Sequence, residues 1–203
     1  MCRRNWSPRP RPSCAPSMIP GLVNLEIERL NSIIDQINEF ANPPHPVRAP
    51  LDVREPLRKA LARVFPPGDA PAVKLKARLD GNLPMVMGDE QALLDCFTHL
   101  LQNAAEALDK RAGAEIEYAA ETRSVPGKGN VVQISIRDNG HGFPENTGEK
   151  MYSPFYTSKA RGMGLGLPIV KRTVIDHNGQ VRIDSNAEGT SVIIDLPTGE
   201  AKT

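Results

Sequence analysis

The chain has few aromatic residues, no long apolar run and almost no net charge, and each shortage excludes a class of protein. Aromatic residues make up 4% of the 203 residues, with one Trp, too few for the stacking platforms that bind single-stranded nucleic acid. Lys and Arg number 25 against 24 Asp and Glu, so no net field favours nucleic acid or a membrane surface as partner. No run approaches the roughly 18 apolar residues of a membrane span, and prolines rather than an apolar stretch follow Arg3 and Arg4. We therefore expect a cytoplasmic protein that binds neither nucleic acid nor membrane.

Cysteine is also scarce. Cys2, Cys14 and Cys96 are an odd number without the spacing of metal ligands, and Cys96 lies in an apolar helical pattern. We predict three free thiols.

Proline divides the chain into two parts. Thirteen of the nineteen prolines lie in the first 71 residues. Residues 1–20 hold five prolines, four Arg and no acidic residue, and such a segment buries too little apolar surface to offset the entropy of ordering. The predicted organisation is a disordered tail at 1–20, a helix at 21–42, a linker with a short helix at 43–71, a compact domain at 72–198 and a tail at 199–203.

The segment Leu22–Ala41 has an apolar stripe with helical spacing. Its apolar residues recur every three or four positions, as in one face of an amphipathic helix. No partner helix follows before the break at Pro43–Pro46. We expect the stripe to pack on a second chain or on a helix of another protein, and the alternative is that it docks on the compact domain. The stripe consists of Val23, Ile27, Leu30, Ile34, Ile37 and Ala41.

The compact domain alternates between strand and helix patterns, which predicts the α/β class with helices on one face of a mixed sheet. Residues 138–164 are rich in Gly and Pro without a clear period, and a loop of that length in a compact domain suggests functional mobility. The predicted helices are Val53–Val64, Asp89–Leu108 and Leu165–Asp176, and the predicted strands are Ala72–Asp80, a hairpin of Ala114–Arg123 with Val131–Arg137, Gln180–Asp184 and Ser191–Leu196.

Two glycine-containing segments are candidates for contact with a nucleotide. Gly162–Leu167 is a glycine cluster that opens into a helix, where backbone amides and the helix dipole attract an anion; ordinary glycine turns before helices are also common. In Asp138–Gly142 a strand ends in an acid followed by two glycines. That carboxylate can accept a hydrogen bond from an exocyclic amine such as that of adenine, or it can cap its own turn.

The third candidate is Asn103, in the middle of the first long helix. An amide is a poor helix former but a good hard-oxygen ligand for Mg²⁺. The neighbouring Ala104, Ala105 and Ala107 are small enough to let phosphate and metal approach the helix. His99 shares the face of Asn103 four residues earlier, where a hydrogen-bonded structural role is more common than a metal-ligand role.

Four segments in order resemble the boxes of sensor histidine kinases, of the wider GHKL ATPase superfamily. The closing Glu188–Thr190 and Ile194–Pro197 are similar to the family's final strand, and the segment Ile175–Gly179 resembles the nitrogen-regulation sensor kinases in particular. The resemblance implies a Bergerat-type two-layer sandwich that binds ATP and Mg²⁺ and transfers a phosphoryl group to a histidine, then to an aspartate of a response regulator. The matching boxes are Asn103–Ala107 (N), Asp138–Gly142 (G1), Ser153–Lys159 (F) and Gly162–Leu167 (G2).

The resemblance also assigns roles to residues. Asn103 should coordinate Mg²⁺, Asp138 should accept from the adenine amino group, and Gly140 and Gly142 should shape the adenine pocket. Lys159 is either a phosphate contact or a solvated loop lysine. The remaining nucleotide-binding residues that the resemblance implies are Thr157, Gly162, Gly164, Leu165, Gly166, Leu167 and Thr190.

The sequence departs from the family in two ways. The N box usually has an Asn where this chain has His99, a poor Mg²⁺ ligand. No acceptor histidine with an adjacent acid on an apolar helix is evident, because His45 lies between prolines, His141 in a turn and His177 at a helix end. Leu22–Ala41 would then be a partial dimerisation helix. The favoured interpretation is a histidine kinase core, incomplete in this chain.

Two alternatives stay open. The first is a nucleotide-gated interaction module that transfers nothing and binds a response regulator or an intact kinase. The second is an ATPase that hydrolyses ATP with a glutamate base. Glu106 is the only acid in the N box, but it follows Asn103, whereas the base of the family's hydrolases precedes that position.

Overall fold

The computed structural model divides the chain into two units, residues 1–35 and 36–203. The predicted tail at 1–20 lies outside the described residues. In the predicted helix at 21–42, only Ile27, Ile34, Ile37 and Asn38 are described; all four are helical, and the isoleucines are 44–54% exposed. Whether this helix dimerises stays a prediction. The remaining described residues are 46–66, 73–108, 111–127, 129–144, 147–157 and 162–199.

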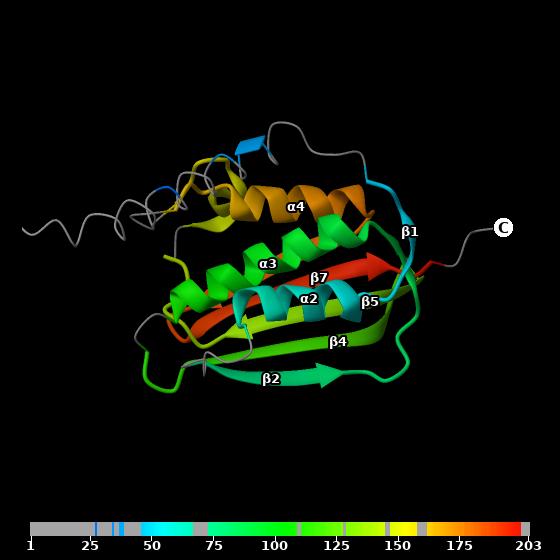
Figure 1. Ribbon diagram of the computed structural model, residues 1–203, viewed down its shortest axis with the longest axis horizontal. Helices are drawn as coiled ribbons and strands as arrows, with labels where there is room; N and C mark the ends of the chain where they lie inside the picture. Colours follow the sequence, from blue (N-terminus) through cyan, green and yellow to red (C-terminus); the bar gives the residue numbers. More distant parts are fainter. Residues whose placement is uncertain are drawn as a thin grey trace, which may run out of the picture. The chain divides into compact units, whose positions relative to one another are not determined.

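The centre of the second unit is a five-stranded mixed sheet in the order β2-β4-β5-β7-β6 (Figure 1). β2 pairs parallel to β4, whereas β4–β5, β5–β7 and β7–β6 pair antiparallel. The predicted hairpin therefore forms, with Val125 opposite Gly129 at its turn. The predicted α/β class with a mixed sheet is confirmed. The strands are β2 (Lys74–Leu79), β4 (Glu115–Val125), β5 (Gly129–Asp138), β6 (Gln180–Asn186) and β7 (Gly189–Pro197).

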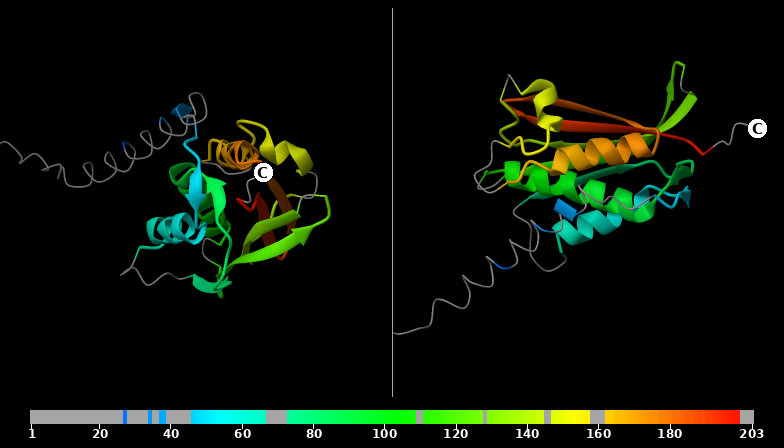
Figure 2. Two further views of the ribbon diagram at one scale, coloured as in Figure 1. Left: turned by 90° about the vertical axis from the view of Figure 1, so that its right-hand side faces the viewer. Right: turned by 90° about the horizontal axis from the view of Figure 1, so that it is seen from above.

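Three helices cover one face of this sheet, as two views show (Figures 1 and 2). Each has an apolar stripe at helical spacing, and the stripes pack on the inward residues of β4, β5 and β7 to form one core. Phe97, Leu93 and Leu101 of the central helix are fully buried. A short 3-10 helix, η1 (Gly148–Tyr152), interrupts the predicted loop at 138–164. The helices are α2 (Arg54–Val64), α3 (Glu90–Ala107) and α4 (Gly166–Asp176).

A small second sheet was not expected from the sequence. β1 (Ala49–Leu51) pairs antiparallel with β3 (Val86–Gly88). Each strand has only three residues, too few for an alternating pattern to be visible. Its position brings the segment before α2 against the start of α3, so part of the predicted linker is built into the folded unit.

The helix α2 is also packed within this unit. Val53, Leu57 and Ala60 are at most 1% exposed and belong to the same core as α3. We expect Leu57→Ala to lower the free energy of unfolding by about 2–5 kcal/mol, because the substitution removes buried methyl groups and leaves a cavity. Urea denaturation measures this change. Leu79→Ala, at a leucine 41% exposed, is the control and should cost less than about 1 kcal/mol; equal costs would show that α2 does not stabilise the domain.

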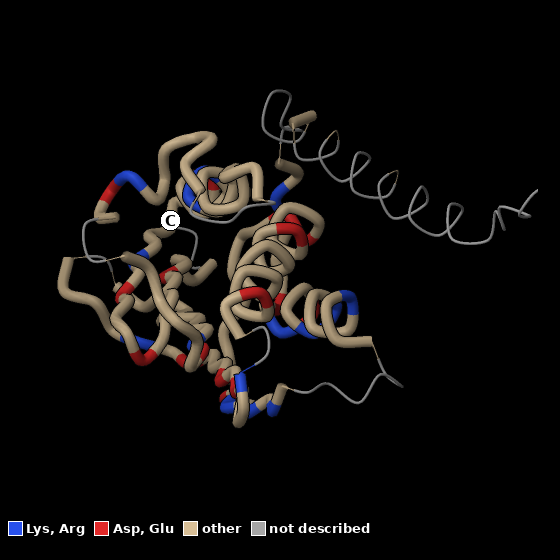
Figure 3. The backbone as a smooth tube through the Cα atoms, turned by 90° about the vertical axis from the view of Figure 1, so that its left-hand side faces the viewer, with Lys and Arg blue, Asp and Glu red and all other residues tan. Residues whose placement is uncertain are grey.

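The other face of the sheet is polar. On the edge strand β2, Lys76 pairs with Glu115 at 2.6 Å and Arg78 with Glu117 at 2.9 Å, so basic and acidic residues interleave across β2 and β4 (Figure 3). Charged side chains on an edge strand oppose pairing with other strands.

Candidate functional site

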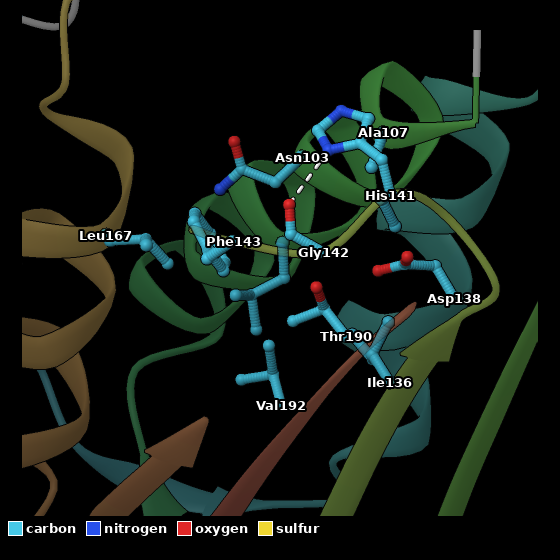
Figure 4. Close-up of a pocket in the computed structure, with 12 residues that line it drawn as sticks. Asn103, Ala107, Ile136, Asp138, His141, Gly142, Phe143, Leu167, Thr190 and Val192 are labelled. Atoms are coloured by element: carbon cyan, nitrogen blue, oxygen red, sulfur yellow. Dashed lines mark hydrogen bonds between the residues drawn. The ribbon is translucent and has the colours of Figure 1, made fainter. Parts of the chain in front are cut away.

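One pocket lies between α3 and the ends of β5 and β7, on the helical face of the sheet (Figure 4). Its walls are mainly aliphatic and aromatic, and its polar groups come from few side chains. Figure 4 shows Asp138 and Thr190 at the strand ends, Asn103 on α3 and Leu167 on α4. The lining residues are Leu100, Asn103, Ala104, Ala107, Ile136, Asp138, His141, Gly142, Phe143, Leu167, Thr190 and Val192.

Asp138 is the last residue of β5 and provides a buried carboxylate in this apolar pocket. It follows Ile134 and Ile136 on the inward face of the strand, which leaves it 6% exposed. Burial raises the pKa of the Asp138 carboxyl above its ordinary value, although hydrogen bonds from the backbone N–H groups of Gly140 and Thr190 act in the opposite direction. Burying a carboxylate is costly, and the two backbone hydrogen bonds offset only part of this cost, because the pKa stays raised.

Hydrogen bonds and a close contact with α3 hold the turn after Asp138 in place. The amide of Asn139 donates to the carbonyl of Gly113 at 3.0 Å and accepts from the backbone N–H of Glu115 at 2.8 Å. The N–H of Gly140 donates to Asp138 Oδ1 at 2.8 Å. A Cβ at Gly140 would lie 2.7 Å from the Cβ of Ala107, so the turn touches α3 only because both residues are small.

Gly142 approaches the β6–β7 connection even more closely. Its φ is +65°, and a Cβ there would lie 1.9 Å from the carbonyl oxygen of Asn186. The next residue, Phe143, donates its N–H to Ser185 Oγ at 2.8 Å, and this hydroxyl lies 3.0 Å from Thr190 Oγ1. The glycine segment thus forms one rim of the pocket.

The helix α3 forms the opposite wall. Asp89 caps its N-terminus by accepting from the N–H of Ala92 at 3.0 Å. Near the other end, Asn103, Ala104 and Ala107 line the pocket. Of these residues, Ala107 lies next to the turn that follows Asp138.

The second glycine cluster precedes α4. Gly164 has φ +69°, and a Cβ there would lie 2.5 Å from the carbonyl oxygen of Tyr156; its own carbonyl accepts from the N–H of Phe155 at 3.1 Å. Leu165 is buried. A Cβ at Gly166 would lie 3.8 Å from Asn103 Nδ2, so the start of α4 is next to the amide on α3.

The structure brings most of the predicted site residues together. Asn103, Asp138, Gly142, Leu167 and Thr190 line the pocket, and Gly140 lies directly behind Asp138. Gly162, Gly164 and Leu165 directly precede α4, and Gly166 is its first residue. Thr157 is the last described residue of the preceding segment. Lys159 lies outside the described residues.

Several pocket residues were missed by sequence reasoning. Phe143 and His141 belong to a loop without a period, whereas Ile136 and Val192 are signalled only by the alternation of their strands. Ser185 supports the loop through its hydroxyl and had no motif around it.

This arrangement suits a flat heteroaromatic ring with an exocyclic amine. Apolar walls would hold the ring, and the one buried carboxylate would accept from the amine. Among the described residues no three His, Cys, Asp or Glu side chains gather as metal ligands. A Mg²⁺ ion here would therefore take its ligands chiefly from a bound phosphate chain and water, with Asn103 as an oxygen ligand from the protein, which is how Mg²⁺ is commonly held.

Residues 88–200 match the family described as histidine kinase-, DNA gyrase B- and HSP90-like ATPase. The chain belongs to this family. The match includes the pocket and both glycine segments, and it confirms the predicted resemblance to the GHKL superfamily.

Three known proteins illustrate the likeness to the histidine kinase branch. Sensory histidine kinase/phosphatase NtrB of Rhizobium meliloti (strain 1021) is 31% identical over 186 residues, which cover 86% of this chain and 48% of NtrB. The solved structure of a mycobacterial sensor histidine kinase, MprB, has a TM-score of 0.63 and 27% identity over 75% of this chain and 98% of that chain. The histidine kinase ThkA, solved with response regulator protein TrrA, has a TM-score of 0.73 and 22% identity over 93% of this chain and 54% of that chain, a likeness of fold.

The similarity to NtrB supports the predicted nitrogen-regulation subtype. The chain of this histidine kinase-like ATPase spans about half the length of the NtrB relatives it matches. No helix in the described part of the chain is long and apolar enough to cross a membrane.

Proposed function

We propose that this chain is the ATP-binding catalytic part of a two-component sensor histidine kinase. The observation that carries the proposal is Asp138, a buried carboxylate at the end of β5 in an otherwise mainly apolar pocket that Asn103 borders. Membership in the histidine kinase-like ATPase family and similarity to NtrB support it.

The adenine ring would occupy the part of the pocket around Asp138. The carboxylate accepts a hydrogen bond from the exocyclic amino group of adenine, which guanine lacks at that position. Ala107 would border the ring, Gly140 lets the turn after Asp138 pack against Ala107, Gly142 shapes the rim, and Thr190 lies beside the carboxylate.

The phosphates would extend along α3 toward the start of α4. Asn103 would hold a Mg²⁺ ion, which would supply positive charge to neutralise the phosphates. Gly162, Gly164 and Gly166 let backbone amides approach the phosphates at the N-terminus of α4. Leu165 anchors this segment in the core, Leu167 closes the pocket, and Thr157 and Lys159 are the contacts proposed from the segment before it.

The chain's own contribution to the reaction is binding and orientation. Phosphoryl transfer requires little covalent chemistry from the protein, so holding the γ-phosphate in line with an acceptor histidine supplies most of the catalysis. The acceptor would be on a helix of a dimeric kinase that packs with Leu22–Ala41, and a response regulator aspartate would receive the group next. NtrB is named a histidine kinase, and ThkA is solved with a response regulator.

Calorimetric titration of the full chain with ATP, with and without Mg²⁺, tests this proposal. We expect micromolar to sub-millimolar affinity that Mg²⁺ strengthens. Asn103→Ala should abolish the strengthening and leave the Mg²⁺-free affinity nearly unchanged, because only the metal ligand is removed. Glu117→Ala, on the open face of the sheet, is the control. A wild-type chain without affinity for ATP would contradict the proposal.

A transfer assay distinguishes a kinase from an interaction module. Radiolabelled ATP is supplied with this chain and an acceptor-bearing kinase helix pair whose own ATP-binding domain has been removed. Labelled acceptor supports the enzyme, and ATP binding without any transfer supports the non-transferring module.

A further inference from the structure

His177 is a buried histidine near the opposite end of α3 from the pocket, and both of its ring nitrogens have hydrogen-bond partners. It directly follows α4 and is 4% exposed. Its Nε2 lies 2.9 Å from the backbone nitrogen of Asp89, and its Nδ1 lies 2.7 Å from the carbonyl oxygen of Thr173. Because a backbone N–H can only donate, Nε2 must be the acceptor, and Nδ1 carries the proton that is donated to Thr173. The neutral ring joins the end of α4 to the start of α3.

The same two helix ends are in contact with the segment that leads into the domain. Val47 donates its backbone N–H to Asp89 Oδ2 at 2.8 Å, while Asp89 Oδ1 caps α3. Arg48 donates to the carbonyl oxygen of Asp176, the last residue of α4. Residues Pro46–Arg48, here called the leading segment, therefore contact α3 and α4 at the residues beside the His177 bridge.

The other ends of these helices form the nucleotide pocket. Asn103 lies fourteen positions after Asp89 on α3, about 21 Å along the helix axis, and Gly166 and Leu167 begin α4 beside it. Helices are stiff elements, so a change in spacing at one end of a packed pair is carried to the other end. A force on the leading segment would alter the pocket through this connection.

We propose that Asp89 and His177 form a clasp through which the leading segment controls the spacing of α3 and α4, and with it the affinity for ATP. This inference rests on the proposed function, since it concerns regulation of the same pocket. It makes His177 a positioning residue for the nucleotide site, although His177 lines no part of the pocket. The leading segment follows the predicted helix Leu22–Ala41 in the sequence.

Two substitutions separate the two hydrogen bonds of His177. His177→Gln places an amide oxygen near the position of Nε2, which keeps the bridge to Asp89 and loses the bond within α4. His177→Asn places its amide nitrogen near the position of Nδ1, which keeps the bond to Thr173 and loses the bridge. We expect His177→Asn to weaken ATP binding by about fivefold or more, a typical size for coupling between sites, and His177→Gln to retain most of the wild-type affinity.

The wild-type chain provides a second test that does not depend on the folding of a variant. Coupling is reciprocal, so ATP should strengthen the clasp. Hydrogen exchange of the Val47 and Asp89 amides should slow by about fivefold at saturating ATP. The amide of Phe65, bonded to Leu61 at the end of α2, should exchange at the same rate with and without ATP.

The outcomes separate the clasp from the proposed function. A wild-type chain that does not bind ATP overturns both. A wild-type chain that binds ATP, with Val47 and Asp89 exchange unaffected or slowed no more than that of Phe65, overturns the clasp alone. Equal affinities of wild type and a folded His177→Asn also overturn it, and rescue by His177→Gln together with slowed exchange supports it.

Discussion

Asp138→Asn is expected to weaken ATP binding by about 10- to 150-fold, the effect of losing a hydrogen bond to a charged group, worth about 1.5–3 kcal/mol. The carboxylate accepts from the backbone N–H groups of Gly140 and Thr190. Its two oxygens offer about four lone-pair sites, so a site remains to accept from adenine. An asparagine has one oxygen and one NH₂ group, so in either orientation one donor faces another donor. Calorimetric titration with Mg-ATP measures the loss.

The same substitution should not destabilise the fold. Burial raises the pKa of the Asp138 carboxyl, so its charged form is disfavoured in the folded state. A raised pKa adds stability below the ordinary value near 3.8, and this stability is lost as the pH rises through the folded-state pKa. We therefore expect removal of the buried charge to offset the lost backbone hydrogen bond in Asp138→Asn at pH 7. The unfolding free energy of the variant relative to wild type should fall as the pH is lowered toward 3.8, where the wild-type carboxyl is protonated.

Asp195→Asn is the matched control. Asp195 is also 6% exposed, but it lies on the polar face of the sheet, where it pairs with Arg182 at 3.3 Å and accepts from Gln133 at 2.7 Å. Its substitution should reduce stability and leave ATP affinity unchanged. Unaltered ATP affinity in Asp138→Asn would refute the role of Asp138 in binding adenine.

Gly142→Ala is expected to be the most disruptive single substitution at the pocket, with a loss of about 2–5 kcal/mol of unfolding free energy and no measurable ATP binding. A left-handed φ costs a residue with a Cβ about 1–2 kcal/mol, and the Cβ would also lie 1.9 Å from the carbonyl oxygen of Asn186. Backbone of the pocket rim must shift to relieve this overlap, at a further cost typical of overpacking. Urea denaturation and calorimetry with ATP measure the two effects.

Gly127→Ala isolates the steric part of that loss. Gly127 has φ +78°, similar to Gly142, but nothing lies within 4 Å of the position of an added Cβ. The Gly127→Ala variant should lose only about 1–2 kcal/mol of unfolding free energy and bind ATP with wild-type affinity. If both variants lose the same stability, the contact between Gly142 and Asn186 is not what constrains the rim.

The sequence predicted the α/β class and the long elements because their patterns extend over many residues. The apolar stripe of Leu93, Phe97 and Leu101 predicted the helix α3, and the alternation of Ile134 and Ile136 predicted the strand β5. The short strands β1 and β3 left no such signal. They form because the backbone of residues 49–51 meets that of residues 86–88, a pairing between positions distant in sequence.

The candidate site, like the fold, has features that the sequence predicts and features that only the tertiary structure decides. From the sequence alone we predicted which residues would contact a nucleotide, because glycines next to a strand end or a helix start, and an amide within a helix, have recognisable local chemistry and together resemble the boxes of a known family. Tertiary structure alone decided that Asp138 is buried, that Phe143 and Val192 line the pocket, and that His177 bonds to Asp89. Burial and hydrogen bonding between distant segments depend on how the layers pack, and packing is a property of the whole chain that no local pattern specifies.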